Sequence, residues 1–361
     1  QIGIWSSVGQ LYEPEDADQL MYYREDQKGQ VLEEGINEAG AFSSWIAAAT
    51  SYTNHNEQMI PFYIYYSMFG FQRVGDLAWC AGDMQARGFL LGGTAGRTTL
   101  AGEGLQHQDG NSHLMASTIP NCISYDPSFA FELAVIIHDG MRRMFVAQEN
   151  VFYYISVMNE NYSHPTMPKD VEDGILKGLY KLSSSELSNS KPGGGETPEV
   201  QLMGCGTILR ECMAAAEILE NDYGVAANIW SATSFNELRR DGLSIQRWNT
   251  LHPESDAKIP YITQCLEGAK GPVIAATDYM KIYADQVREF IPNSFYVLGT
   301  DGFGRSDSRA QLRKYFEVDA PNIVIAALKS LCNEGEMDAA IITKAIKKLG
   351  IDPDRADPAT A

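Results

Sequence analysis

The glycine-rich segment 94–113 holds most of the side chains that could transfer protons. It contains Glu103, His107, Asp109 and His113, and carboxylates and imidazoles are the usual general acids and bases of proteins. The glycines leave little to bury, so we expect a loop at the surface or in a cleft. The alternative is a solvated loop in which the histidines are incidental. His107 and His113 are not four residues apart and no third ligand follows, so a zinc site is not expected.

A further carboxylate, Glu38, falls on the apolar side of a helix predicted over residues 29–50. Helical neighbours three, four or seven residues away share one face. The residues on that face are Val31, Phe42, Trp45 and Ala49. A carboxylate among such groups is costly to ionise, so Glu38 is expected to keep its proton to unusually high pH. A protonated carboxyl can donate a hydrogen bond, which suits activation of a heterocyclic cofactor nitrogen. The alternative is a surface carboxylate on a distorted helix.

Aromatic side chains mark the end of a predicted strand. The run Tyr63-Ile-Tyr-Tyr-Ser-Met-Phe69 leaves this strand and enters a loop. Ligands of α/β proteins bind at the carboxyl ends of strands. Tyr66 and Phe69 are therefore candidates to face a ligand, one as a hydrogen-bond donor and the other as a stacking surface. The alternative is that both are core aromatics.

The elements that must position these residues alternate between strand and helix, which is typical of an α/β fold with mostly parallel sheets. Aromatic and β-branched runs predict strands at 59–66, 88–92, 118–122, 151–157, 200–203, 227–233, 272–276 and 295–299. Apolar periodicity predicts helices at 29–50, 70–86, 128–139, 208–223, 319–334 and 337–348.

A polar, proline-containing stretch at 159–168 is a candidate linker. We therefore expect two α/β domains, residues 1–165 and 166–361. A second stretch of low complexity, 183–199, is expected to be a mobile hairpin loop between strands at 178–182 and 199–204.

Two glycine-containing loops carry weaker signals. Thr300–Ser308 is punctuated by glycine but lacks the order of a phosphate-binding loop, so a loop at the edge of a domain is favoured. The single Gly-x-Gly at Gly204–Gly206 is a weak nucleotide signal.

Composition limits the classes of partner. The chain has 361 residues, a net charge of −19 and a pI near 4.7. No basic run is present, which disfavours nucleic acid or an anionic membrane as a partner. The six cysteines form no C-x-x-C pair and are expected to be mostly buried free thiols. The acidity fits a cytoplasmic protein, or one that docks a basic partner, and no membrane-spanning run is found in the sequence. The start at Gln1 suggests a fragment or a processed form.

Long runs of the sequence resemble a known enzyme family, the homodimeric bacterial pyruvate dehydrogenase decarboxylating component (acetyl-transferring). The runs are Glu34-Gly-Ile-Asn-Glu38, Pro61-Phe-Tyr-Ile-Tyr-Tyr-Ser-Met-Phe-Gly-Phe-Gln72, Gly102-Glu-Gly-Leu-Gln-His107, Ile119-Pro-Asn-Cys-Ile-Ser-Tyr-Asp126 and Leu298-Gly-Thr-Asp-Gly-Phe-Gly-Arg-Ser-Asp-Ser308. The similarity covers essentially the whole chain. It matches only the middle, pyrimidine-binding domain and the carboxyl-terminal domain of the family.

The resemblance implies a thiamine diphosphate enzyme with a transketolase-like fold. Glu38 matches the glutamate that hydrogen-bonds the aminopyrimidine ring nitrogen, and Phe69 matches the aromatic that stacks on the pyrimidine. Tyr66 and His107 match residues that position pyruvate and its adduct, and His107 is also implicated in proton handling or reductive acetylation. Glu103 matches a carboxylate in the channel between paired active sites.

The resemblance also implies partners that this sequence does not contain. The family is homodimeric, decarboxylates pyruvate and transfers the acetyl group to the lipoyl domain of a dihydrolipoyl acetyltransferase. Its magnesium and diphosphate ligands lie in a Gly-Asp-Gly segment and an Asn-containing one, and neither is found here. We expect those ligands in an amino-terminal domain that this chain lacks. A transketolase, a 2-oxoglutarate dehydrogenase relative, and a non-catalytic assembly module are the alternatives.

Overall fold

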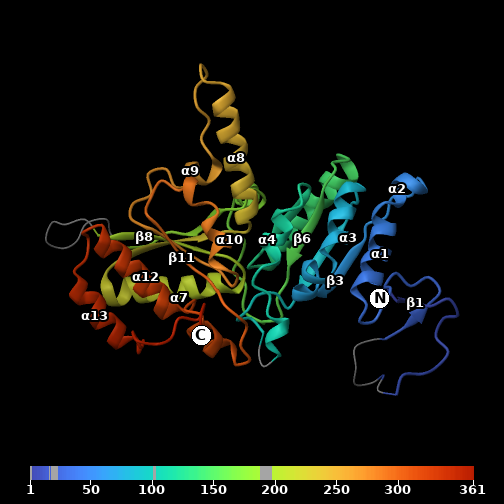
Figure 1. Cartoon of the computed structure of the whole chain (residues 1–361), viewed down its shortest axis with the longest axis horizontal. Coiled ribbons are helices and arrows are strands. Elements are labelled where there is room, and N and C mark those ends of the chain that lie inside the picture. The colour runs from blue at the N-terminus through green and yellow to red at the C-terminus, as the bar shows by residue number, and fades with distance from the viewer. Residues whose placement is uncertain (1, 16, 18–22, 101–102, 188–196) are drawn as a thin grey trace.

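The computed structural model describes all residues except 1, 16, 18–22, 101–102 and 188–196. Its sheets lie in a row along the long axis of the molecule (Figure 1). At the amino-terminal end, β1 (Ile4–Trp5) and β2 (Glu25–Asp26) form a short parallel pair. No helix in the described ranges combines the length and apolar character that crossing a membrane requires.

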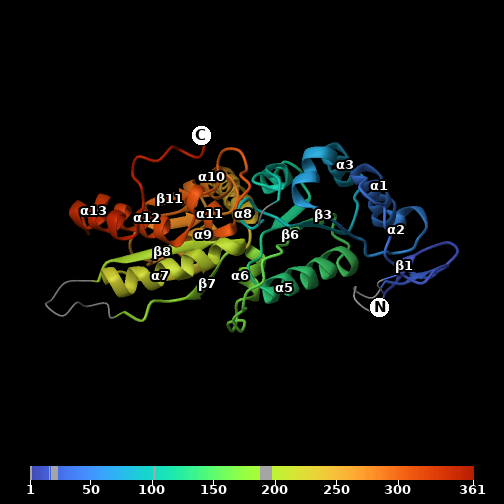
Figure 2. The ribbon, with the colours of Figure 1, turned by 90° about the horizontal axis from the view of Figure 1, so that it is seen from below.

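The middle sheet has four parallel strands in the order β3-β4-β6-β5. Its strands are β3 (Phe62–Tyr66), β4 (Phe89–Gly93), β5 (Cys122–Tyr125) and β6 (Phe152–Ser156). One face packs against α1 (Glu38–Ala49), α3 (Phe71–Asp83) and α4 (Ser112–Ser117), and the other against α5 (Ala130–Met141). Figure 2 shows α5 on the opposite side of this sheet from α1 and α3. The short α2 (Ser51–Asn54) extends α1, and a π-helical turn (Arg142–Val146) extends α5.

The carboxyl-terminal sheet has five strands in the order β11-β10-β8-β9-β7, of which β7 alone runs antiparallel. Its strands are β7 (Tyr180–Ser183), β8 (Glu199–Gly204), β9 (Ala226–Ser231), β10 (Val273–Ala276) and β11 (Phe295–Leu298). One core joins it to α7 (Leu209–Tyr223) and α12 (Ala320–Asn333), and a second core joins it to α8 (Phe235–Leu251), α9 (Tyr261–Cys265) and α10 (Lys281–Asp285). The remaining helices are α6 (Glu172–Lys177), α11 (Arg309–Tyr315) and α13 (Ala339–Lys348).

The structure confirms the α/β fold with mostly parallel sheets and corrects three predicted elements. The helix predicted over 29–50 begins only at Glu38, because the Asn37 side chain caps it by accepting a hydrogen bond from Gly40 N at 3.1 Å. Val31 is extended instead and forms a bridge with Ile4. The apolar stripe predicted across Glu38 therefore holds for Phe42, Trp45 and Ala49, which are buried, and is wrong for Val31.

The other two corrections concern strands. The strand predicted at 118–122 lies at Cys122–Tyr125, since residues 112–117 form the short helix α4 and the chain turns at 118–121. The predicted hairpin is wrong because β7 pairs with β9, while β8 lies between β9 and β10. Residues 188–196 of its predicted loop lie outside the described residues.

The cysteines are free thiols, as predicted, although they are not uniformly buried. Cys122, Cys205 and Cys212 are buried, whereas Cys80 is exposed on α3. Burial raises the pKa of the Cys122 thiol to about 12. Cys205 and Cys212 are likewise raised in pKa by burial, so the three buried cysteines are inert core residues near neutral pH.

The middle and carboxyl-terminal sheets meet through buried polar groups at the ends of their strands. Asp126, which follows β5, donates its N–H to the Thr233 carbonyl at 2.8 Å and accepts from Gly206 N at 3.2 Å. Asn236 Nδ2 donates to Ser124 Oγ at 2.6 Å. Part of the carboxyl edge of the middle sheet is therefore covered by the carboxyl-terminal domain.

Candidate active site

Two loops leave the same edge of the middle sheet side by side. β3 ends at Tyr66 and continues into a 3-10 turn at Ser67–Phe69, and β4 ends at Gly93 and continues into the loop 94–111. The loop contains a second 3-10 turn at Leu105–His107, which contacts the first. Because β3 and β4 are parallel neighbours, both loops extend from their carboxyl ends, where α/β folds bind ligands.

The two turns bring together three of the predicted site residues. The ring of His107 lies 5.2 Å from the ring of Tyr66 and 5.0 Å from the ring of Phe69, measured between centroids. The rings of Tyr66 and Phe69 are 6.1 Å apart. Tyr66 remains 48% exposed, so the group forms an aromatic ledge that is open on one side. Tyr66 is therefore not the core aromatic of the alternative interpretation, and Phe69 is only partly buried.

Glu38 reaches the same group through Arg73. Its carboxylate pairs with Arg73 Nη1 at 2.8 Å, and the Arg73 guanidinium carbon lies 4.0 Å from the centroid of the Phe69 ring. The Glu38 side chain is 18% exposed. The surroundings predicted for Glu38 are therefore wrong in one respect, because a guanidinium rather than only apolar groups faces the carboxylate.

Arg73 is a residue of this site that the sequence reasoning missed. It lies in the first turn of α3, seven residues after Tyr66 and four after Phe69. A cation placed one helical turn beyond a loop aromatic can return over the ring. The four-residue spacing of Phe69 and Arg73 was the one sequence feature that could have indicated this contact, although it gives no reason to choose Arg73 over other surface cations.

Glu103 and His107 carry buried polar atoms without partners. Among the described residues, Glu103 Oε2 and His107 Nδ1 have no hydrogen-bond partner. Buried polar atoms are nearly always satisfied in folded proteins. On a loop beside an open aromatic ledge, these two atoms are available to bind a ligand.

Asp109 and His113, the other proton-transfer candidates of the loop, have structural positions. Asp109 Oδ1 accepts from the N–H groups of Asn111 and Ser112, each at 3.0 Å, at the start of α4, while its second oxygen accepts from Ser67 Oγ. Asp109 thus ties the two loops together.

His113 is fully buried on α4. Its Nε2 lies 3.0 Å from Ser156 Oγ, and its ring stacks on Tyr283 at 4.9 Å. Burial lowers the pKa of His113 to about 3, so its imidazole is neutral near pH 7. Asp109 and His113 therefore both have structural roles and are no longer proton-transfer candidates.

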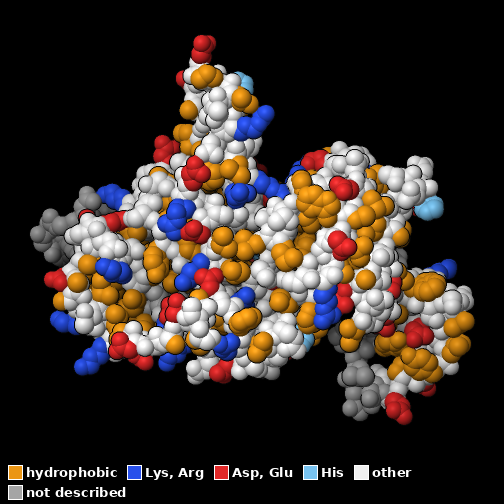
Figure 3. Space-filling model, in the orientation of Figure 1, with side chains coloured by type: hydrophobic (Ala, Val, Ile, Leu, Met, Phe, Trp, Pro, Cys, Tyr) orange, Lys and Arg blue, Asp and Glu red, His pale blue; other side chains and the backbone are white. Residues whose placement is uncertain are grey.

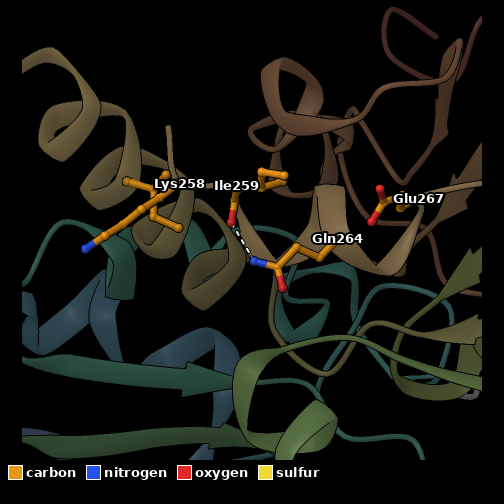
Figure 4. Close-up of a pocket in the computed structure, with 5 residues that line it drawn as sticks. Lys258, Ile259, Gln264 and Glu267 are labelled. Atoms are coloured by element: carbon orange, nitrogen blue, oxygen red, sulfur yellow. Dashed lines mark hydrogen bonds between the residues drawn. The ribbon is translucent and has the colours of Figure 1, made fainter. Parts of the chain in front are cut away.

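No metal site accompanies these residues, and a separate cavity lies elsewhere. The described part of the chain contains no group of three His, Cys, Asp or Glu side chains placed to hold a metal ion. A cavity of about 720 Å³ next to α8 and α9 is lined by Ile245, Lys258, Ile259, Gln264 and Glu267. Figure 4 labels the last four of these residues. No sequence-predicted site residue lines this cavity, so we place the candidate site at the β3–β4 edge.

Comparison with known proteins agrees with this architecture. The family model described as pyruvate dehydrogenase E1 component middle domain matches residues 1–165, and the model described as transketolase-like TK C-terminal domain matches residues 178–319. A solved structure titled "Split gene transketolase, inactive beta4 tetramer" superposes with a TM-score of 0.58 at 15% identity, covering 91% of this chain and 92% of that chain. The fold is thus that of the transketolase-like α/β proteins.

Curated relatives define the family within that fold. The pyruvate dehydrogenase E1 component of Pseudomonas aeruginosa is 61% identical over 359 residues, and that of Escherichia coli K12 is 58% identical over 363 residues. These alignments cover 99% and 100% of this chain but 40% of each relative. The chain belongs to the pyruvate dehydrogenase E1 component family and spans about 40% of the length of these relatives.

Proposed function

We propose that the full-length protein carrying this chain decarboxylates pyruvate with thiamine diphosphate and transfers the acetyl group to the lipoyl domain of a dihydrolipoyl acetyltransferase. The observation that carries the proposal is the convergence of Glu38, Tyr66, Phe69 and His107 at one strand edge in a chain about 60% identical to E1 components. The family membership supports the reaction class, and the proximity of these residues supports the part that we propose for each.

The aminopyrimidine end of the cofactor fits the groups at this edge. An aromatic ledge with one open side suits a flat heterocycle, and a carboxylate at the start of α1 can meet a ring nitrogen. Thiamine diphosphate, when bound, supplies the nucleophilic carbon and the electron sink on which a 2-oxo acid loses carbon dioxide. We assign Phe69 to stacking on the ring and Glu38 to the ring nitrogen, where its carboxyl exchanges a proton.

The substrate side of the site is assigned to the second loop. His107, whose Nδ1 is unpaired, can donate to or accept from pyruvate or the acetyl group. The half-exposed Tyr66 phenol can donate to the substrate carboxylate. Glu103, whose Oε2 is also unpaired, is assigned to the channel between paired sites.

Magnesium and the diphosphate do not fit the residues described here, because no cluster of metal ligands is present among them. We therefore place their ligands outside this chain and assign no step to the metal. On this basis residues 1–361 alone are inactive. The split-gene transketolase structure supports this, since it aligns over nearly the same extent and its title describes that assembly as inactive.

An exposed apolar strand supports a homodimer as the working assembly. β3 is an edge strand, and Phe62, Ile64 and Tyr66 on one side of it are 44%, 68% and 48% exposed. Figure 3 also shows hydrophobic side chains gathered over the amino-terminal segment at lower right. Contiguous exposed apolar groups on a sheet edge favour association. We propose that the rest of the subunit and its partner cover this surface.

The proposal is tested with the full-length protein, magnesium and thiamine diphosphate. Carbon dioxide release is measured from pyruvate and from 2-oxoglutarate. Consumption of a ketose phosphate is measured separately, with an aldose phosphate present to accept the two-carbon group. We expect pyruvate to be turned over at least ~10-fold faster than either competitor, a difference that small changes in a pocket can supply. Preference for 2-oxoglutarate or the ketose phosphate contradicts the substrate. No cofactor-dependent turnover of any of them would favour an assembly module.

A further inference from the structure

The loop that carries Glu103 and His107 is held at its beginning by the carboxyl-terminal sheet. Asp278, which follows β10 and is buried, accepts from Thr98 N at 2.9 Å and Thr98 Oγ1 at 2.7 Å through one oxygen. Its other oxygen accepts from Thr99 Oγ1 at 2.8 Å. In Figure 1 the turquoise loop lies against the orange loops that follow β10 and β11.

The end of the same loop is held by a side-chain amide that pairs with backbone. Gln108 Oε1 accepts from Arg305 N at 2.8 Å, and Gln108 Nε2 donates to the Arg305 carbonyl. Gln108 is 2% exposed, so water cannot replace these bonds easily. Two residues later the Gly110 carbonyl accepts from Met280 N at 2.9 Å.

The approach of the two loops at Gln108 requires a glycine. A Cβ on Gly304 would lie 2.7 Å from Gln108 Oε1 and 2.7 Å from the Leu105 carbonyl O. Both distances are below ordinary contact, and one of the atoms belongs to backbone, which cannot rotate away. Gly304 lies in the segment Thr300–Ser308, for which the sequence favoured only a loop at a domain edge.

Within the described part of the chain, no hydrogen bond holds Nδ1 of the His107 ring. The ring touches Tyr66 and Phe69, and its Nδ1 is unpaired among the described residues. The direction of the ring is therefore set mainly by the His107 backbone. His107 N donates to the Gly104 carbonyl at 2.9 Å, and the next residue in the chain is Gln108. The buried amide of Gln108 is the nearest anchor of that backbone.

We propose that Gln108, clamped on the backbone of Arg305 across Gly304, is a positioning residue for His107. The carboxyl-terminal domain thereby fixes a group of the active site, beyond any part it has in subunit contact. This inference rests on the proposed function. A displacement of about 1 Å in a reacting group can lower turnover by about 100-fold, so loss of the clamp affects the chemical step.

The test compares variants of the full-length enzyme with bound magnesium and thiamine diphosphate. Gln108→Ala removes both bonds to Arg305, and Gly304→Ala presses on the same contact from the other domain. Gln106→Ala is the matched control, because Gln106 is exposed on the same loop, two residues away. Each change is also made in a His107→Ala background, and kcat/KM for pyruvate, cofactor affinity and the thermal midpoint are measured.

We expect Gln108→Ala and Gly304→Ala to lower kcat/KM at least ~10-fold while cofactor affinity stays within about 2-fold. In the His107→Ala background the same changes should lower kcat/KM by less than about 2-fold, because Gln108 then has no His107 side chain to position. If Gln108→Ala does not fold, Gly304→Ala decides the outcome in the same way.

Equal activity of Gln108→Ala and Gln106→Ala would overturn the inference, and so would an undiminished loss in the His107→Ala background. A wild-type enzyme that does not turn over pyruvate overturns the proposed function and the inference together. An active wild type with unaffected variants overturns the inference alone.

Discussion

Asp126 should make the stability of the protein fall as pH rises, and an asparagine should remove that fall. The carboxyl group lies fully buried where the two larger sheets meet. Its Oδ1 accepts from Ser156 Oγ, and its Oδ2 has no hydrogen-bond partner among the described residues. Burial raises the pKa of Asp126 from 3.8 to about 7, with the nearby carboxylates of Asp278 and Glu132 acting in the same direction.

The sign and size of the effect follow from that pKa. Below pH 3.8 the carboxyl is protonated in both the folded and the unfolded state, and the free energy of unfolding carries no penalty from its burial. As pH rises to about 7, the unfolded chain ionises while the folded group keeps its proton, so the free energy of unfolding falls. At about 1.4 kcal/mol per pH unit the whole loss is about 4 kcal/mol, of which about 2–3 kcal/mol falls between pH 5 and pH 7.

Asp126→Asn keeps the acceptor for Ser156 and cannot ionise. We expect its free energy of unfolding, relative to wild type, to rise by about 2–3 kcal/mol between pH 5 and pH 8. Urea denaturation of the full-length protein at pH 5, 6, 7 and 8 measures this difference. Asp83→Asn is the control, because Asp83 is exposed at the end of α3, and its difference from wild type should stay flat. The reasoning is refuted if the difference in free energy of unfolding between Asp126→Asn and wild type stays constant with pH, or if it favours asparagine more at pH 5 than at pH 8.

Three further predictions concern the candidate site. Glu38→Gln in the full-length enzyme should lower carbon dioxide release at least ~100-fold through lost proton exchange. Its thermal midpoint should change little, because the partly exposed pair with Arg73 contributes at most about 1 kcal/mol. Near wild-type turnover at saturating cofactor would remove Glu38 from the mechanism. His107→Ala should impair pyruvate turnover far more than calorimetric cofactor affinity, and the reverse pattern would contradict its role. Residues 1–361 alone should bind thiamine diphosphate weakly and release no carbon dioxide, because stacking and one hydrogen bond supply only about 2–3 kcal/mol; micromolar, magnesium-dependent binding would reveal a metal site in this chain.

Elements with strong local signals were predictable from the sequence. The periodic helices α3, α7, α12 and α13 lie within a few residues of their predicted ranges. The start of α1 was missed because the seven-residue spacing of Val31 and Glu38 fits a helical period, although Gly35, with φ +68°, and Asn37 interrupt it. The β7–β9 pairing was missed because it joins segments that are far apart in sequence, and a flexible-looking loop favours the nearer partner.

The chemistry of the site was predictable by residue type and its accessibility was not. Tyr66 and Phe69 were chosen because they lie at the end of a strand, and His107 because it is a titratable group in a glycine-rich loop. Parallel pairing of β3 with β4 brings the three together. His113 looked equally suited to proton transfer. It is buried because Ser156 and Tyr283, which are remote in sequence, enclose it. Local sequence carries no signal for such enclosure.

The contacts of loop 94–111 explain why the middle sheet and its loops need the carboxyl-terminal domain beside them. Ala95 and Leu100 of the loop are buried, and hydrogen bonds from the carboxyl-terminal domain hold it on either side of Glu103 and His107. The partners of Thr98 and Gln108 lie 180 and 197 residues further along the chain. Each is a buried contact that water cannot replace, so an isolated middle domain would leave Glu103 and His107 on an unanchored segment. The carboxyl-terminal domain contributes no side chain to the aromatic ledge, yet the placement of the residues on it depends on that domain.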